Sequence, residues 1–295
     1  MAMSLIICSR NRAPQLKHTL EQLDIAALKR LDIDLVLVDS ASSDDTSTVM
    51  ADFAKTLPIT VQVFKVKEPG ASIARNVGAR NAQSDTLIFT DDDCYFQDGY
   101  FDAVVEHYDP EKFQFAGGST ILFDPTDANS GVIELPYDDT FIVEPGTLLH
   151  AGMIQSSNLV FQKAAFDKIR GFDVRLGAGT PFSCEDIELC TRASLAGFTG
   201  AFLPQLVVLH HHGRKQGSID LEMVERGYER GRGAYYAHLM TIGVNNVWDL
   251  WESWRKPEKP APMTRDAVAS MMFEFQGAAG YFEMVLRNSP PPEES

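Results

Sequence analysis

Short apolar runs alternate with longer amphipathic segments along the first hundred residues of the chain. Four of these runs have the length of buried strands and cover residues 4–8, 34–39, 59–66 and 87–90. The segments between them have helical spacing, with Pro14 in the first turn of the first helix and Pro69-Gly70 before the third. This alternation of strand and helix predicts an α/β fold, in which a parallel sheet with right-handed crossovers carries helices on both faces.

The second hundred residues continue the α/β pattern with less regular spacing. We predict strands within residues 113–123, 157–161 and 198–209, the last partly broken by Pro204. Helices are predicted at 99–108, 163–169 and 183–195. Residues 124–146 combine acidic residues with proline and glycine, which predicts a long loop that contacts an acceptor or closes as a lid.

Beyond residue 217 the chain changes to helices rich in charged and aromatic residues, in which Gly227, Gly231 and Gly233 weaken the first helix or mark a close backbone approach. The last helix carries apolar residues at alternating spacings of four and three, which is the pattern of a coiled-coil seam. We call this set the apolar seam: Val268, Met272, Phe275, Ala279, Phe282 and Leu286. We expect the seam, including Met272, Phe275 and Phe282, to be buried, either against its own domain, which is the commoner arrangement, or in a homodimer.

Composition limits the partners and the compartment. The 295 residues carry a net charge of −15, which argues against nucleic acid or an anionic membrane held by bulk charge. The four cysteines have no paired C-x-x-C spacing and are predicted to be free thiols in a reducing compartment. The chain leads directly into a strand without a signal peptide, and no apolar run has the length of a membrane span, so we expect a cytoplasmic protein.

Three consecutive carboxylates, Asp91, Asp92 and Asp93, follow the fourth predicted strand. Their charges repel, and a divalent cation shared with substrate phosphates is the usual partner of such a group, although a solvated acidic turn is the alternative. In an extended chain Asp91 and Asp93 face one way and Asp92 the other. Polar residues also follow the first two strands, at 9–11 and 39–40. Because ligands bind outside the carboxyl ends of parallel strands, we expect the three groups to converge on a functional site.

A second polar group follows the predicted strand at 198–209. His210, His211 and His212 come directly after this strand, which favours a metal or phosphate ligand over an ordinary surface position. Arg214 and Lys215 lie in the loop bounded by glycines at 213 and 217 and could donate to a pyrophosphate. The alternative for the loop is a solvated basic turn.

Several segments together resemble the inverting family-2 glycosyltransferases of the GT-A fold. They are residues 8–12 (CSRNR), 38–46 (VDSASSDDT), 70–78 (GASIARNVG), 89–93 (FTDDD) and the acidic motif Glu185-Asp186 with Glu188-Leu189 and Arg192-Ala193. They occur in the order of the family, across residues 4–212, which makes the joint match specific. The chain departs from the family at Ser40 and Ala41, which leaves the nucleotide preference open, and Arg230-Gly231-Arg232-Gly233 is similar to a glycine-arginine segment of many relatives.

The resemblance implies a Rossmann-like GT-A domain over residues 1–217, with a mixed sheet and helices on both faces. A C-terminal helical extension at 218–288 and a disordered tail at 289–295 would follow. The implied activity is hexosyl transfer with inversion, from a nucleotide-diphosphate sugar, with UDP favoured, to a hydroxyl of a saccharide or lipid-linked acceptor. Implied partners also include Mn²⁺ or Mg²⁺ and a peripheral contact at the inner face of the membrane. The apolar seam, not the resemblance, adds a homodimer through the C-terminal helix, and the net charge argues against nucleic acid.

The resemblance also assigns roles to single residues. It implies metal binding by Asp93, Asp91 and His210. Donor binding is assigned to Ser9, Arg12, Asp39, Ser42, Arg75, Asp91, Asp92 and, from the basic loop, Arg214. Asp186 is the expected general base, with Glu185 as the fallback, because unpaired N–H groups at a helix start favour an ionised carboxylate. On their own, Glu185 and Asp186 would be ordinary first-turn acids.

Two other functions compete with glycosyl transfer. A sugar-phosphate nucleotidyltransferase is also an α/β nucleotide binder, but it would need a glycine-rich basic loop after the first strand, and residues 9–13 contain no glycine. A non-catalytic nucleotide-sugar binder would keep the fold, but it would not need the intact acids Asp91, Asp93, Glu185 and Asp186 together with His210. Transfer or hydrolysis of nucleotide sugars, with and without manganese, separates the three.

Overall fold

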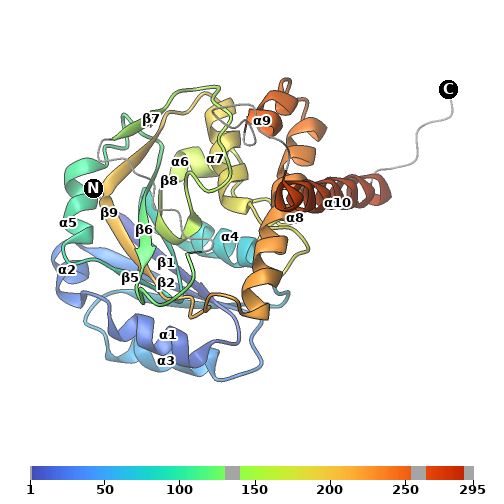
Figure 1. The fold of residues 1–295 in the computed structure, drawn as a ribbon. Helices are drawn as coiled ribbons and strands as arrows, with labels where there is room; N and C mark the ends of the chain where they lie inside the picture. The colour runs from blue at the N-terminus through green and yellow to red at the C-terminus, as the bar shows by residue number, and fades with distance from the viewer. Residues whose placement is uncertain (1, 130–139, 254–263, 289–295) are drawn as a thin grey trace.

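A mixed sheet forms the centre of the molecule (Figure 1). The computed structural model describes residues 2–129, 140–253 and 264–288. The first four strands, β1 (Met3–Ser9), β2 (Ile33–Ser40), β3 (Val61–Val66) and β4 (Thr86–Asp91), pair in parallel in the order β3-β2-β1-β4. This confirms the parallel half that the alternation of strands and helices predicts.

The second half of the sheet is mostly antiparallel and extends from β4. The sheet continues through β8 (Leu159–Gln162), β6 (Phe115–Leu122), β9 (Gly200–His210) and β5 (Cys94–Phe96). Only the β6–β9 pair is parallel among these described pairings. Strand β9 runs through Pro204 without ending, and the pairing with β6 shifts register between Gly118 and Ser119 instead. The predicted break at Pro204 is therefore a bulge.

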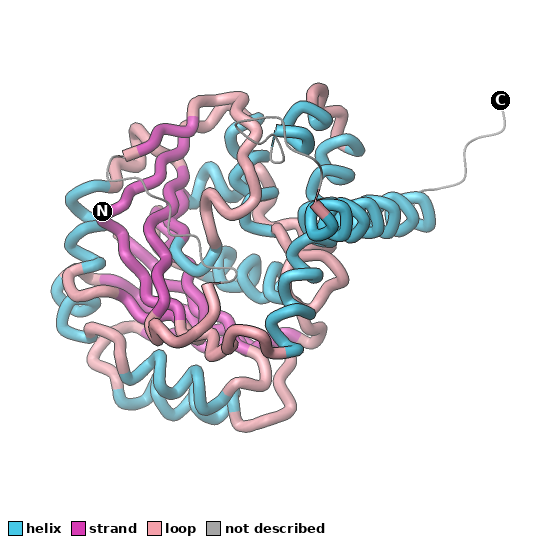
Figure 2. Tube along the Cα trace, viewed as in Figure 1, coloured by secondary structure: helices cyan, strands magenta, loops and turns pink. Residues whose placement is uncertain are grey.

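Helices cover both faces of the sheet, as Figure 2 shows. One face carries α1 (Ala13–Glu21), α2 (Ile25–Arg30), α3 (Thr46–Thr56) and α5 (Tyr100–His107), whose apolar residues share one core cluster. The other carries α4 (Ala71–Asn81), α6 (Lys163–Lys168) and α7 (Glu185–Leu195) in a second cluster. In β1, Leu5 and Ile7 face the first cluster and Ile6 the second, as the period of a strand requires.

The segment expected to be a long loop contains a short strand. Residues 141–143 form β7 (Phe141–Val143), which pairs antiparallel with the start of β9. The expectation of an uninterrupted loop over 124–146 is therefore wrong for its last part, while residues 130–139 lie outside the described residues. The strand could have been predicted from its sequence, because it consists of three consecutive residues with high β-propensity, Phe141, Ile142 and Val143.

Three helices complete the described chain: α8 (Ile219–Thr241), α9 (Val247–Ser253) and α10 (Arg265–Asn288). Ser218 caps α8 by accepting a hydrogen bond from the backbone N–H of Leu221 at 3.2 Å. Apolar residues of α8 and α10, among them Tyr235 and Tyr281, belong to the same core cluster as α4 and α7. The division at 217/218 stays a prediction, and the expected tail at 289–295 lies outside the described residues. None of the helices in the described part is long and apolar enough to cross a membrane.

Helix α10 buries a different face from the one its apolar spacing predicts. Glu274, Ala278 and Tyr281 are buried, whereas Met272 and Phe275 of the apolar seam are about half exposed. Glycines set this orientation, because a Cβ atom on Gly233 of α8 would lie 1.8 Å from the backbone oxygen of Glu274. The expectation that the seam packs on its own domain is therefore wrong, apart from Phe282, which is partly buried.

Candidate active site

The acid triplet lies where β4 ends and the chain turns into β5. Because Asp92 and Asp93 form this turn, the alternation of an extended chain does not apply, and the expected grouping of Asp91 with Asp93 is wrong. Arg12 contacts both turn residues, with its Nη1 3.2 Å from Asp92 Oδ1 and its Nη2 2.7 Å from Asp93 Oδ2. Asp91 instead contacts Arg75, at 2.7 Å.

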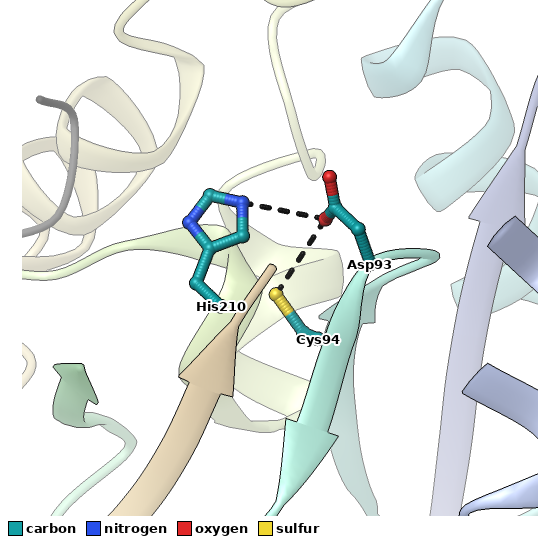
Figure 3. Close-up of side chains that lie close together, drawn as sticks. All are labelled: Asp93, Cys94 and His210. Atoms are coloured by element: carbon teal, nitrogen blue, oxygen red, sulfur yellow. Dashed lines mark hydrogen bonds and ion pairs between the residues drawn. The ribbon is translucent and has the colours of Figure 1, made fainter. Parts of the chain in front are cut away.

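Asp93 is the centre of a small cluster of potential metal ligands (Figure 3). Its Oδ1 lies 3.3 Å from His210 Nε2 and 3.8 Å from Cys94 Sγ, while its Oδ2 accepts from Arg12. Burial acts to raise the pKa of Asp93, but the hydrogen bond and charge of His210 and the charge of Arg12 hold that pKa below its usual range. Asp93 is therefore an ionised carboxylate beside an imidazole, a donor set that fits a divalent cation.

Asp92 has a different environment from its neighbour. Ser9 donates to its carboxylate, and the hydroxyl of Thr19 donates to its backbone oxygen at 2.6 Å. Burial raises the pKa of Asp92 to about 7, against the opposing effect of Arg12. Asp92 thus ties the turn to β1 and α1, and the predicted convergence of the first and fourth strand ends is confirmed.

Arg75 of α4 joins the two acidic motifs of the chain. Its Nη2 contacts Asp91 and its Nη1 lies 2.8 Å from Glu185 Oε1 at the start of α7. The side chain is buried, and its guanidinium lies 5.5 Å from the centre of the Phe172 ring. Two carboxylates balance this buried charge, so Arg75 holds the end of β4 and the start of α7 at a fixed separation.

Asp186 lies next to Glu185 but makes other contacts. Its Oδ2 accepts from the backbone N–H of Ser156 at 3.2 Å and its Oδ1 from that of Ile187 at 2.8 Å. Burial raises the pKa of Asp186 to about 7, and the charge of Glu185 acts in the same direction. The expectation that helix-start N–H groups keep this pKa low is therefore wrong, because burial outweighs them. A carboxylate that exchanges its proton near neutral pH suits a general base.

The end of β2 forms a polar cluster beside the acid triplet. Asp39 is 1% exposed, and it accepts from the backbone N–H of Ser42 at 2.8 Å, from Ser47, and from Lys65 Nζ at 2.9 Å. The hydroxyl of Ser42 accepts from the backbone N–H of Asn11 at 3.0 Å, which joins the ends of β1 and β2. Sequence reasoning missed Lys65 and Ser47, although Lys65 pairs directly with Asp39 in the β2–β3 register.

The three histidines after β9 take separate partners. His210 faces Asp93, His211 Nδ1 lies 3.0 Å from the Tyr95 hydroxyl, and His212 Nε2 lies 3.0 Å from the backbone oxygen of Ala128. Lys215 is paired with Asp124, at 2.8 Å, and with Asp127, so it is not free to donate to a pyrophosphate as expected. Arg214 differs, because its buried Nη1 has no hydrogen-bond partner among the described residues.

A further charged group lies behind the site and was missed from the sequence. His238 Nε2 of α8 lies 2.8 Å from Glu188 Oε1 of α7, and its Nδ1 lies 2.7 Å from the Tyr281 hydroxyl of α10. Arg192 also pairs with Glu188, and its Nη2 donates to the backbone oxygen of Gly171 at 2.7 Å. The three ligand atoms of Asp173, Glu188 and His238 lie close together, but the arginine makes this group a salt-bridge network. It fixes the orientation of the helix that carries Glu185 and Asp186.

Comparisons with known proteins place the chain among enzymes of one kind. The model of the family described as "Glycosyl transferase family 2" matches residues 4–170. Among curated proteins, the uncharacterized glycosyltransferase YwdF of Bacillus subtilis (strain 168) is 27% identical over 124 residues, which are 42% of this chain and 44% of that protein. The chain thus matches less than half the length of this relative.

Solved structures show the same fold at low sequence identity. The mannosyltransferase PcManGT from Pyrobaculum calidifontis, in complex with GDP-Man and Mn²⁺, gives a TM-score of 0.57 at 17% identity over 98% of this chain and 76% of that one. GalNAc-T7 with UDP, GalNAc and Mn²⁺ gives a TM-score of 0.59 at 13% sequence identity, over 98% of this chain and 57% of that one. S. aureus TarS 1–349 in complex with UDP-GlcNAc gives a TM-score of 0.53 at 16% sequence identity, over 94% of this chain and 82% of that one. These likenesses confirm the expected GT-A fold.

Proposed function

Because the chain belongs to glycosyl transferase family 2, we propose that it transfers a sugar from a nucleotide-diphosphate donor to a hydroxyl of an acceptor, with inversion. One observation carries the proposal: Arg75 holds both acidic motifs at the carboxyl edge of the sheet. Arg75 contacts Asp91 of the first motif and Glu185 of the second, and Asp93 and Asp186 follow within two residues of these contacts. This bridge supports the proposal that a donor site and a base site lie next to each other.

A divalent cation, Mn²⁺ or Mg²⁺, is part of the proposal. Asp93 and His210 are the residues that would hold it, since the ionised carboxylate and the imidazole lie 3.3 Å apart. Asp91 is the other expected ligand, and its side chain is one-third exposed while one of its oxygens accepts from Arg75. When bound, the cation would neutralise charge on the departing pyrophosphate. Arg214, whose buried Nη1 has no hydrogen-bond partner among the described residues, is proposed as a further donor to phosphate oxygens.

Inversion in one displacement needs a base on the acceptor side of the donor. Asp186 is our choice, because its pKa of about 7 lets it take the proton of the acceptor hydroxyl near neutral pH. Glu185 is the less suitable group, since Arg75 holds its carboxylate at 2.8 Å. The contact with Arg75 thus distinguishes the two neighbouring acids: Glu185 is the proposed positioning residue and Asp186 is the proposed base.

The donor is proposed to be a UDP-sugar that carries a hexosyl group. Two of the similar structures contain UDP or UDP-GlcNAc, while the mannosyltransferase contains GDP-Man. Asp39 and Ser42 are proposed to contact the base or ribose, and both are buried at the end of β2, at 1% and 9% exposed. The acceptor is proposed to be a saccharide or a lipid-linked sugar, met in the cytoplasm or at the inner face of the membrane during polysaccharide synthesis.

A donor screen tests the proposal. The purified chain would be incubated with UDP-, GDP-, dTDP- and CDP-sugars, with Mn²⁺, with Mg²⁺ and with a chelator, and release of the nucleoside diphosphate would be measured. Release of a diphosphate from one donor class, lost in the chelator, supports the proposal. Release of inorganic pyrophosphate from a nucleoside triphosphate and a sugar phosphate would instead identify a nucleotidyltransferase. Binding without any turnover would identify a non-catalytic binder.

A further inference from the structure

Apart from Phe282, the apolar seam lies on the outward face of α10, exposed to solvent in the single chain. Val268 is 39% exposed, Met272 57%, Phe275 47% and Leu286 73%. The opposite face of the helix packs on α8 through Glu274, Ala278 and Tyr281, so α10 is already fixed to the domain. In Figure 1 the helix extends sideways from the domain beside α8. Most of the seam therefore remains exposed although the helix itself is well packed.

The exposed surface extends beyond α10 onto α9. The ring of Trp248, 64% exposed, stacks on Trp251 at a centroid distance of 5.3 Å. The ring of Trp251 lies 5.4 Å from that of Phe275. Trp251 itself is 4% exposed, so this stack brings the exposed Trp248 of α9 near the seam, and exposed apolar residues that gather in this way mark interaction sites.

The seam is symmetric about one residue. Gly277 is the midpoint of the pairs Val268 and Leu286, Met272 and Phe282, and Phe275 and Ala279. If a second copy of α10 packs antiparallel across this midpoint, every seam residue meets an apolar residue of the other copy. Such a match of a surface with itself is what a two-fold axis requires.

We propose that the chain forms a two-fold symmetric homodimer in which the seams of two α10 helices pack antiparallel. The seam contains no charged residue, so the contact buries no unpaired charge. The net charge of −15 per chain disfavours an anionic membrane on this surface, and it also makes two copies repel at long range. Added salt screens this repulsion, so the dimer becomes tighter as ionic strength rises.

Molar mass tests the contact in the full chain. Light scattering after size exclusion is expected to give twice the 32.7 kDa of one chain for the parent protein. Leu286→Glu and Met272→Glu are expected to give the single mass and to keep the circular dichroism spectrum of the parent, because both side chains are more than half exposed and the fold of the single chain does not depend on them. The matched control is Val105→Glu, because Val105 lies on α5 and its side chain is 48% exposed. This variant is expected to keep the double mass. A parent protein of single mass at high concentration and salt would refute the dimer, even if it bound lipid vesicles.

Cysteine crosslinking tests the antiparallel register. Gln276 is exposed and adjoins the midpoint of the seam, so Gln276→Cys in one copy lies opposite Gln276→Cys in the other. A short bismaleimide is expected to crosslink this variant in high yield. In the antiparallel arrangement the two copies of Val268→Cys are separated by roughly 27 Å, from the rise of 1.5 Å per residue, and do not crosslink. The parent chain, with its four native cysteines, is the control. Crosslinking of Val268→Cys, or none with Gln276→Cys, overturns the proposed register.

Discussion

Arg75 contacts acids from two distant parts of the chain, and this gives neighbouring carboxylates different environments. Glu185 is paired with the guanidinium, whereas the hydrogen bonds of Asp186 among the described residues come from backbone N–H groups. Burial then raises the pKa of Asp186 to about 7. The two residues are equivalent in the sequence, and their contacts in the structure distinguish them.

Asp186→Asn is expected to lower the turnover number by a factor of about 10² to 10⁴, because the amide cannot accept the proton of the acceptor. Donor affinity is expected to stay nearly unchanged, since Asp93, His210 and Ser42 remain in place. Glu185→Gln is the matched variant and is expected to reduce turnover less. Steady-state turnover and donor affinity, measured for both, decide the assignment: an active Asp186→Asn beside an inactive Glu185→Gln would reverse the roles.

The same pKa predicts a pH profile. Asp186 can accept a proton only when it is ionised, so kcat/KM is expected to rise with pH and to reach a plateau above a pKa of about 7. The group is protonated below that value, and activity falls tenfold for each unit of pH there. Rates measured between pH 5.5 and 8.5 at saturating Mn²⁺ test this. A profile that is flat over the range would argue against Asp186 as the base.

Asp93→Ala is expected to weaken Mn²⁺ binding by about tenfold or more, since it removes the carboxylate that faces His210. Mn²⁺ bound to the protein without nucleotide can be measured by electron paramagnetic resonance. Asp52→Ala is the control, because this acid lies exposed on α3. Equal affinities in the two variants would remove Asp93 from the metal site.

At the scale of the elements, close backbone contacts decide how the C-terminal helices pack. A Cβ atom on Gly231 of α8 would lie 1.9 Å from Ser183 Oγ, directly before α7, and one on Gly277 of α10 would lie 1.9 Å from the backbone oxygen of Arg230. Glycine is required at these places because backbone or short side chains fill the space. The packing of α8 therefore bears directly on the start of the helix that carries Glu185 and Asp186.

Two glycines of α8 make a matched pair for this argument. Gly233→Ala is expected to destabilise the protein by at least about 2 kcal/mol, since the new methyl group would overlap the Glu274 backbone and force the helices apart. Gly227→Ala meets nothing within 4 Å and is expected to stabilise by about 0.5–1 kcal/mol, through the helix propensity of alanine. Denaturant unfolding of both variants measures the difference. Equal free energies of unfolding would show that the α8–α10 contact contributes little.

At the scale of the whole molecule, the sequence predicts the elements with strong local signals and misses those that depend on distant contacts. Strands β1, β2 and β4 were found because each is a continuous apolar run, and the family was found because its motifs occur in order. The buried face of α10 was predicted wrongly, because Gly277 and Ala278 decide it through contact with α8. The different partners of Asp91 and Asp93 were likewise missed, since a turn replaces the extended chain there. The pairing of Arg75 with Glu185 joins residues 110 positions apart, and no local pattern shows it.

The C-terminal helices share a core with the sheet, and this leads to a prediction about cooperativity. Ala234, Tyr235 and Leu239 of α8 are fully buried in the cluster that also contains Phe89 of β4. A separate extension would unfold on its own, whereas helices that complete the core unfold together with it. We therefore expect one transition for the full chain.

Tryptophan fluorescence can distinguish these two cases. The three tryptophans of the chain, Trp248, Trp251 and Trp254, all lie beyond residue 217, so their emission reports on the C-terminal part alone. Far-ultraviolet circular dichroism reports on the helices and strands of the whole chain. Urea unfolding curves from the two signals are expected to have the same midpoint and the same slope, because loss of α8 exposes the core beneath it. A fluorescence transition at lower urea than the dichroism transition would instead show that residues 218–288 are an independent extension.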